Sequence, residues 1–265
     1  MDKTSVLGVI LGVIAIIVSL IFKGTSLVVL LNPAAFSIIF LGTVATILIA
    51  FPANEVKRVP KLFKIVFQKK KEPNIGELIQ LLVSFSILAR REGLLALEQK
   101  MEDIEDPFLK QGMKMIVDGA DVDFIKDTME EELIAMEERH AAGATIFSQA
   151  GTYAPTLGVL GAVMGLIAAL GNLDDIDALG HAIAAAFVAT MFGIFAGYVL
   201  WHPFANKLKR KSQQEVLIKN LMIEGILSIQ TGIAPKAIGE KLMVYVPHSE
   251  RQAVSEIIQK GEDPK

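Results

Sequence analysis

Residues 149–204, QAGTYAPTLGVLGAVMGLIAALGNLDDIDALGHAIAAAFVATMFGIFAGYVLWHPF, decide how this chain folds. They hold two apolar segments joined by a short acidic turn. No Asp, Glu, Lys, Arg or His occurs from Thr152 to Leu170 or from Ala182 to Trp201. At 1.5 Å rise per residue, each segment would form a helix about 28–30 Å long, which is about the thickness of a bilayer's hydrocarbon core. The pattern predicts a transmembrane hairpin with helices at 152–170 and 181–201.

Small residues line one face of each predicted helix at helical spacing. The first face holds Pro155, Gly158, Ala162, Gly165 and Ala169, and the second holds Ala186, Thr190, Gly193 and Gly197. Small residues let helix backbones approach closely in lipid, where van der Waals packing joins helices. One interpretation is packing within the hairpin alone. The length of both faces and the hydroxyl of Thr190 favour the other, in which they also form a wall against another chain.

The composition indicates an integral membrane protein with a soluble part. Hydrophobic residues make up 52% of the 265 residues, and the mean hydropathy is +0.48. The net charge of −3 gives no indication of nucleic-acid binding. The chain has no cysteine, which excludes disulfides and thiol chemistry.

Two further membrane helices are predicted near the N-terminus, at 6–22 and 33–51. A signal peptide is the alternative for residues 6–22, but the run is long for one and only Asp2 and Lys3 precede it as charges. Pro33 is suited to the first turn of the second helix. Residues 1–51 are therefore interpreted as a pair of transmembrane helices.

Charge asymmetry predicts how these helices are oriented. Cations follow the second helix and the fourth helix: Lys57, Arg58, Lys61, Lys64, Lys69, Lys70 and Lys71, and then Lys207, Lys209, Arg210 and Lys211. The turn between the third and fourth helices carries only acidic charges, at Asp174, Asp175 and Asp177. The positive-inside rule then places residues 52–148, residues 205–265 and both termini in the cytoplasm. Tyr198 and Trp201 suit an interfacial aromatic belt, and Pro203 is expected to stop or kink the fourth helix.

The cytoplasmic segment 52–148 is predicted to be helical. We expect helices at 75–101 and 107–117, and then a long helix capped by Asp123 that continues into the third membrane helix. After residues 149–204, the tail from 205 to 265 is expected to hold an amphipathic helix to about Gln230 and a shorter one beyond it. The fold class is therefore an all-α membrane protein, with four transmembrane helices, a helical insertion between the second and third, and a helical tail.

No catalytic or metal-binding pattern is present. The sequence has no P-loop, no G-x-S-x-G and no H-E-x-x-H motif. His140 has no neighbouring His, Cys or carboxylate cluster, so it is interpreted as a packed histidine. We expect no cofactor and no enzymatic activity, although a membrane-embedded protease or transferase is the alternative from another functional class.

Several motifs together resemble the MotA family of flagellar stator subunits, in its Bacillus type. They are GTYAPTLGVLGAVMGLIAALG, HAIAAAFVATMFGIFAGYVLWHPFA and LARREGLLALE. The resemblance covers essentially the whole chain. The related TolQ and ExbB proteins have three membrane helices, so the additional N-terminal helix favours MotA. The alternative within the superfamily is a ring that energises a TonB-type or Tol-type periplasmic system.

The resemblance implies partners and a location. Family members lie in the bacterial inner membrane as five copies around two copies of MotB, whose membrane helix supplies an aspartate and whose periplasmic domain binds peptidoglycan. The rotor protein FliG receives the torque. The residues agree with such a partner, because residues 6–22, 33–51, 152–170 and 182–201 hold no Asp, Glu, Lys, Arg or His, and the polar groups at membrane depth are hydroxyls such as those of Thr43, Thr46, Thr190 and the bordering Thr156. A proton-accepting carboxylate must come from another chain.

The resemblance also implies roles for six residues. Pro155 and Pro203 correspond to the prolines at the start of the third and the end of the fourth helix, and Thr190 to the hydroxyl facing the ion path. Arg90 and Glu98 correspond to the charged pair that meets FliG, and the spacing of eight residues places them near one face of the predicted helix 75–101. Sodium-driven members carry a threonine where this chain has Ala162, so protons rather than sodium are the expected ion.

Overall fold

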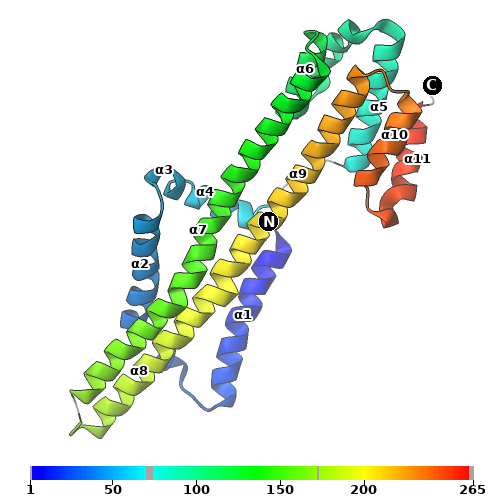
Figure 1. Ribbon diagram of the computed structural model, residues 1–265. Coiled ribbons are helices and arrows are strands. Elements are labelled where there is room, and N and C mark those ends of the chain that lie inside the picture. The colour runs from blue at the N-terminus through cyan, green and yellow to red at the C-terminus, as the bar shows by residue number, and fades with distance from the viewer. Residues whose placement is uncertain (1, 70–73, 172, 263–265) are drawn as a thin grey trace. The chain divides into compact units, whose positions relative to one another are not determined.

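The computed structural model describes residues 2–69, 74–171 and 173–262, and every regular element in that part of the chain is helical (Figure 1). In chain order the α-helices are α1 Lys3–Phe22, α2 Pro33–Ala50, α3 Ala53–Val56, α4 Val59–Phe67, α5 Ile75–Glu92, α6 Pro107–Val117, α7 Val122–Leu170, α8 Ile176–Phe195, α9 His202–Gln230, α10 Pro235–Leu242 and α11 Arg251–Glu262. Short helices of other types lie between them: η1 Leu27–Leu30, η2 Leu94–Asp103, η3 Ala196–Trp201, η4 Met243–Tyr245 and η5 His248–Glu250. The predicted all-α fold is confirmed.

The chain forms two compact units. One combines Met1–Lys70 with Arg139–Arg210, and the other combines Lys71–Glu138 with Lys211–Lys265. Of the cations predicted to follow the second helix, Lys70 and Lys71 lie outside the described residues.

Four helices are long and apolar enough to cross a membrane, which confirms the predicted number, and their apolar segments lie in the first unit. Two of them begin at positions other than predicted, because an aspartate caps each. The Asp2 side chain accepts hydrogen bonds from the amides of Thr4 and Ser5, so α1 begins at Lys3. The Asp175 side chain accepts hydrogen bonds from two amides of the next turn, so α8 begins at Ile176.

Helices α3 and α4 were not predicted, and they lead from the end of α2 to the start of α1 (Figure 1). The nine residues of α4 are too few for a strong periodic signal. Phe63 on α4 packs edge-to-face against Phe147 of α7 and Trp201 of η3, at centroid distances of 4.9 and 5.8 Å. Helix α4 is thus held by tertiary packing.

The start of α1 is tied to two other segments of the first unit. The Asp2 amide donates to the Phe67 carbonyl at 2.7 Å, and the Lys207 ammonium lies 2.8 Å from the Asp2 carboxylate. The hydrogen bond from Lys207, together with one from Thr4, holds the pKa of Asp2 well below its ordinary value. These contacts join the first residues of α1 to the end of α4 and the start of α9.

The second unit is a helical domain with one apolar core. Helices α5, α6, α10 and α11 pack with the first turns of α7 and the second half of α9, and all of them contribute buried Leu, Ile, Met, Val or Phe side chains. Close approach is possible at Gly112 of α6, where a Cβ would lie 2.7 Å from the Met129 sulfur. At Gly225 of α9 it would lie 2.6 Å from a methyl of Leu82. The core therefore depends on small residues as well as on large ones.

Two predicted helix boundaries in this unit are wrong. The helix expected at 75–101 ends at Glu92, because Gly93 adopts φ +90°, and the chain continues as the 3₁₀ helix η2. The cap of α7 is Asp121, whose carboxylate accepts from the Asp123 amide at 2.9 Å, so Asp123 lies inside the first turn. The expected continuation of this helix into the third membrane helix is confirmed, since α7 is unbroken to Leu170.

An ion pair is set into the surface of the second unit. The Lys219 ammonium, whose side chain is 10% exposed, lies 2.7 Å from one Asp106 oxygen and 4.7 Å from the centroid of the Phe108 ring. Burial opposes ionisation of Asp106, but the hydrogen bond and the charge of Lys219, with two backbone amides, outweigh it and lower the pKa of Asp106. The same carboxylate caps α6.

We expect Asp106→Asn to destabilise the second unit by about 2 kcal/mol, because Lys219 stays buried without its counter-charge. Asparagine retains the helix cap, so the change isolates the charge. The measurement is hydrogen exchange of the α6 amides in the detergent-solubilised chain. The folded pKa of Asp106 lies below the unfolded value of about 3.9, so the pair's contribution is present above about pH 4 and is lost as pH falls through the folded value.

Asp103→Asn is the matched control for this measurement. Its carboxylate is 65% exposed and lies 3.5 Å from Lys100, so its loss should change α6 exchange by less than about 1 kcal/mol. Equal exchange in the Asp106 variant and the native chain would contradict a stabilising role for the buried pair.

Candidate functional site

The transmembrane hairpin is built on direct contact between the backbones of α7 and α8. A Cβ placed on Gly158 would lie 3.0 Å from the Gly193 Cα, and one placed on Gly193 would lie 2.7 Å from the Ala154 carbonyl oxygen. No side chain larger than hydrogen fits at either position without displacement of a helix. The same packing continues one level further, where a Cβ on Gly165 would lie 2.9 Å from the Cβ of Ala186.

This contact supports the first interpretation of the small-residue faces, which is packing within the hairpin. Gly158, Gly165, Gly193 and Gly197 are used for packing within the hairpin. Beside the crossing, a Cβ placed on Gly161 would lie 3.0 Å from the Cβ of Ala189 and 3.1 Å from a methyl of Ile38 on α2, so α2 covers this position. Ala162 and Thr190 come next along the two helices. Ala162 and Thr190, both partly buried, therefore lie at one level of the hairpin.

Pro155 lies inside α7, because the helix before the predicted membrane segment 152–170 continues into it, so the proline stands near the start of that segment and does not begin a helix. Because proline has no amide hydrogen, the Gly151 carbonyl loses its usual donor one turn earlier. That carbonyl is directed at η3, since a Cβ on Gly197 would lie 2.7 Å from the Gly151 oxygen and 2.7 Å from the Pro155 ring. Pro155 thus leaves the Gly151 carbonyl, without its helical hydrogen-bond donor, packed against η3.

Pro203 does not stop the fourth helix. The chain stays helical from Ile176 to Gln230, with a π-helical turn, Ala196–Trp201, shortly before the proline. A π turn widens the helix and changes its hydrogen-bond register, which accommodates a residue without an amide donor. Pro203 itself is exposed, in the first turn of α9.

Hydroxyl groups supply the polar side chains beside the crossing. Thr190 donates to the Ala186 carbonyl of its own helix at 3.4 Å, and Thr46 donates to the Thr43 carbonyl at 2.8 Å. The Thr43 hydroxyl is buried and donates to the Ile39 carbonyl. Each hydroxyl oxygen keeps lone pairs that can accept a hydrogen bond. Within the described residues, no cluster of His, Asp or Glu is arranged to hold a metal ion.

Two aromatic residues beyond the end of α8 differ in environment. Tyr198 is 65% exposed, as expected of an interfacial residue. Trp201 instead packs among Phe63, Phe147 and Phe204, and its buried Nε1 has no hydrogen-bond partner in the described part of the chain. Helix α4, which was not predicted, covers this indole, and its expected place in the interfacial belt stays a prediction.

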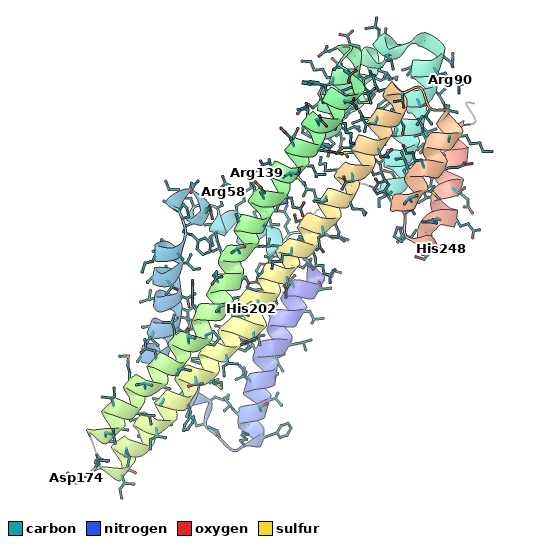
Figure 2. The ribbon with its side chains drawn as sticks, viewed as in Figure 1. Arg58, Arg90, Arg139, Asp174, His202 and His248 are labelled. Atoms are coloured by element: carbon teal, nitrogen blue, oxygen red, sulfur yellow. The ribbon has the colours of Figure 1, made fainter. Side chains whose placement is uncertain are left out.

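His202 is a residue that the sequence did not single out. Its ring lies against α7, where a Cβ on Gly151 would be 2.8 Å from the imidazole, and its centroid is 5.4 Å from that of the Tyr198 ring (Figure 2). Gly151 and His202 are far apart in the sequence and meet only because the two helices pack together. No local sequence pattern could therefore have revealed this contact.

Arg90 and Glu98 lie in the second unit and do not share a helix face. Arg90 is in the last turn of α5, and Glu98 is in η2, beyond the turn at Gly93. The expected placement on one face is therefore wrong. Both side chains are exposed, and neither takes part in an ion pair with any residue that the structure describes. They are available to a charged partner.

Comparison with known proteins identifies the family. Residues 100–220 match the MotA/TolQ/ExbB proton channel family. The chain is 58% identical to motility protein A of Bacillus subtilis over 256 residues, which cover 97% of this chain and 95% of that protein.

Solved structures give the same result. The flagellar MotAB stator complex of Bacillus subtilis contains a chain that matches with a TM-score of 0.91 at 58% identity, covering 95% of this chain and 99% of that one. A chain of C. jejuni MotAB matches with a TM-score of 0.89 at 35% identity, covering 94% and 97%. These findings confirm the expected function and exclude the enzymatic alternative: the chain is a stator subunit of the flagellar motor and belongs to the MotA/TolQ/ExbB proton channel family.

Proposed function

We propose that this subunit conducts protons only together with a partner helix that carries a carboxylate. The observation that supports the proposal is the absence of any Asp, Glu, Lys, Arg or His in residues 152–170 and 182–201, beside the hydroxyl of Thr190. An ion crosses hydrocarbon by way of polar or ionisable groups, and this hairpin has too few. The similar Bacillus subtilis and C. jejuni chains occur in complexes named MotAB, so a MotB-type single-span protein is the proposed partner.

The chain is proposed to lie in the inner membrane with both termini in the cytoplasm. The cations after α2 and at the start of α9 support this orientation, as does the acidic turn at Asp174, Asp175 and Asp177. Both units then contribute cytoplasmic surface, and the turn between α7 and α8 faces the periplasm.

The proposed assembly is five copies of this chain around two copies of the partner. Moving one elementary charge through 100 mV supplies about 2.3 kcal/mol. Protonation and deprotonation of the partner's aspartate would use this energy to alternate its packing against successive hairpins. Because α7 and α8 touch backbone to backbone, a hairpin would respond as one body, and the ring would turn relative to the anchored partner.

The exposed pair of Arg90 and Glu98 is proposed to transmit torque to FliG. Charged groups at a transient interface fix its register and the rate of encounter more than its affinity. The turn at Gly93 separates the two charges onto adjacent elements, so they would present a broader surface than a single helix face.

The proposed ion is the proton. Sodium must be coordinated by several oxygens after it loses water, whereas a proton needs a carboxylate and a hydrogen-bonded route. At the level of Thr190 the opposing residue is Ala162, and Ala189 precedes Thr190. The Gly151 carbonyl that Pro155 leaves without its helical donor lies at Gly197, about two helical turns from Thr190, so it would contact an ion at another level of the pathway. A single hydroxyl makes a poor sodium site.

Charge reversal at Arg90 should weaken rotation without preventing assembly. We expect Arg90→Glu to reduce the torque of tethered cells substantially, because it sets like charges against each other at the rotor surface. A compensating reversal on FliG should restore it. Membrane levels of the complex, measured by immunoblot, should stay unchanged because exposed charges contribute only about 0–1 kcal/mol to stability.

Arg139→Glu is the matched control, because Arg139 is an exposed arginine on α7 (Figure 2). It should leave torque unchanged. Normal rotation in both Arg90→Glu and Glu98→Lys, tested singly, would count decisively against a rotor-facing role for this pair.

Single-motor speed should persist when sodium is replaced by potassium and should fall to near zero when a protonophore is added. The physical reason is the shortage of oxygen ligands beside Thr190. The control is the same protonophore in sodium buffer, which should also stop rotation. A motor that stops on sodium withdrawal would overturn proton coupling and would indicate that main-chain or partner oxygens complete a sodium site.

A further inference from the structure

Cations line the outer face of α4 and the turn that precedes it. Lys57, Arg58, Lys61 and Lys64 are exposed, and their spacing of three and four residues sets them along one side of the helix. None of the four is in an ion pair with another described residue. A row of cations without counter-charges is electrostatically costly unless an anion lies nearby.

The opposite face of α4 holds the helix in place. Leu62, Phe63 and Val66 pack against α7 and α9, where Val66 is fully buried and the centroid of the Phe63 ring lies 6.0 Å from that of Phe204. Leu62 rests on Gly143 of α7, whose Cβ would lie 3.0 Å from a leucine methyl. Because this apolar face is packed, the cations cannot turn inward and stay on the outer side.

The position of α4 coincides with the ends of two membrane-crossing helices. Helix α2 ends at Ala50 and is joined to α4 by the single turn of α3, and α1 begins at Lys3, beside the end of α4, where the Asp2 amide donates to the Phe67 carbonyl (Figure 1). Arg58 lies at the start of α4 (Figure 2). The level at which membrane helices end is the level of the lipid headgroups.

An open surface cavity of about 460 Å³ lies at the border between the two faces of α4. Phe63 and Phe67 supply aromatic walls, and Lys64 and Gln68 supply an ammonium and an amide. A second cavity of about 160 Å³, between α1, η1 and α8, has only apolar lining residues. Of these two cavities, the larger combines an apolar surface with a cation, which is the pattern that suits a molecule with an acyl chain and a charged headgroup.

We propose that this cavity and the cationic face of α4 bind an anionic phospholipid. The acyl chain lies against the rings of Phe63 and Phe67, and the phosphate group is bound by Lys64, with Lys57 and Lys61 attracting the negative surface of the surrounding leaflet. The site is separate from the ion pathway, and its occupancy depends on neither the transported ion nor the rotor.

The test measures lipid retained by the intact stator complex. The complex is reconstituted into nanodiscs of phosphatidylcholine mixed with phosphatidylglycerol. It is then released from the nanodiscs, and the lipids that stay bound are identified by native mass spectrometry. The triple variant Lys57→Gln, Lys61→Gln, Lys64→Gln should retain about tenfold less phosphatidylglycerol than the native complex. Lys64→Gln alone should give a smaller loss in the same direction. Millimolar inorganic phosphate should displace no lipid.

The matched control neutralises three exposed lysines of the second unit: Lys110, Lys114 and Lys126. It should retain phosphatidylglycerol as the native complex does. Two outcomes would overturn the proposal: equal retention of phosphatidylglycerol by the α4 triple variant, or equal retention of phosphatidylcholine and phosphatidylglycerol by the native complex.

Discussion

The contact between the backbones of α7 and α8 at Gly158 and Gly193 is the constraint on which the rest of the structure depends. In lipid, helices gain little from the hydrophobic effect, so they are held by van der Waals packing that requires close approach. A Cβ atom added to Gly158 or to Gly193 would lie within 3.0 Å of a backbone atom of the facing helix. The hairpin therefore exists in this form only because glycine occupies both positions. The carbonyl of Gly151 lies next to Gly197 by virtue of the same approach.

A hairpin packed in this way is a rigid wall with few polar groups. Its glycines are used internally, so its outward surface at the level of Thr190 is apolar except for one hydroxyl, with the Gly151 carbonyl further along. Such a surface can guide an ion but cannot hold its charge in hydrocarbon, because that requires an ionisable group. The proposed division of labour follows: this chain would provide the wall and the surface of the second unit, and a second chain would provide the carboxylate. The aromatic cluster around Trp201 then secures α4 at the end of the hairpin.

The sequence predicts the hairpin well because long uncharged runs have few alternatives to membrane helices. It also predicts that α7 continues from the second unit into the membrane, since the apolar period is unbroken. Prediction from the sequence fails where a tertiary contact or a single backbone dihedral angle determines whether a helix forms or ends. Helix α4 is stabilised because Phe63 and Val66 pack in one apolar cluster with Phe147 and Phe204. Those two residues are distant from α4 in the sequence. The positive φ of Gly93 separates Arg90 from Glu98, and a glycine in a helical pattern is compatible with either outcome. Pro203 does not stop the helix because a π-helical turn precedes it and accommodates the missing amide.

The most direct test of the central claim is proton flux through the chain without its partner. The purified chain is reconstituted into liposomes containing a pH-sensitive dye, a potassium diffusion potential is applied, and gramicidin serves as the positive control. Because residues 152–170 and 182–201 carry no acidic or basic side chain, acidification should not exceed that of empty liposomes. Voltage-driven acidification through the chain alone, lost in Thr190→Ala, would contradict the account, since it would mean that the hairpin itself relays protons.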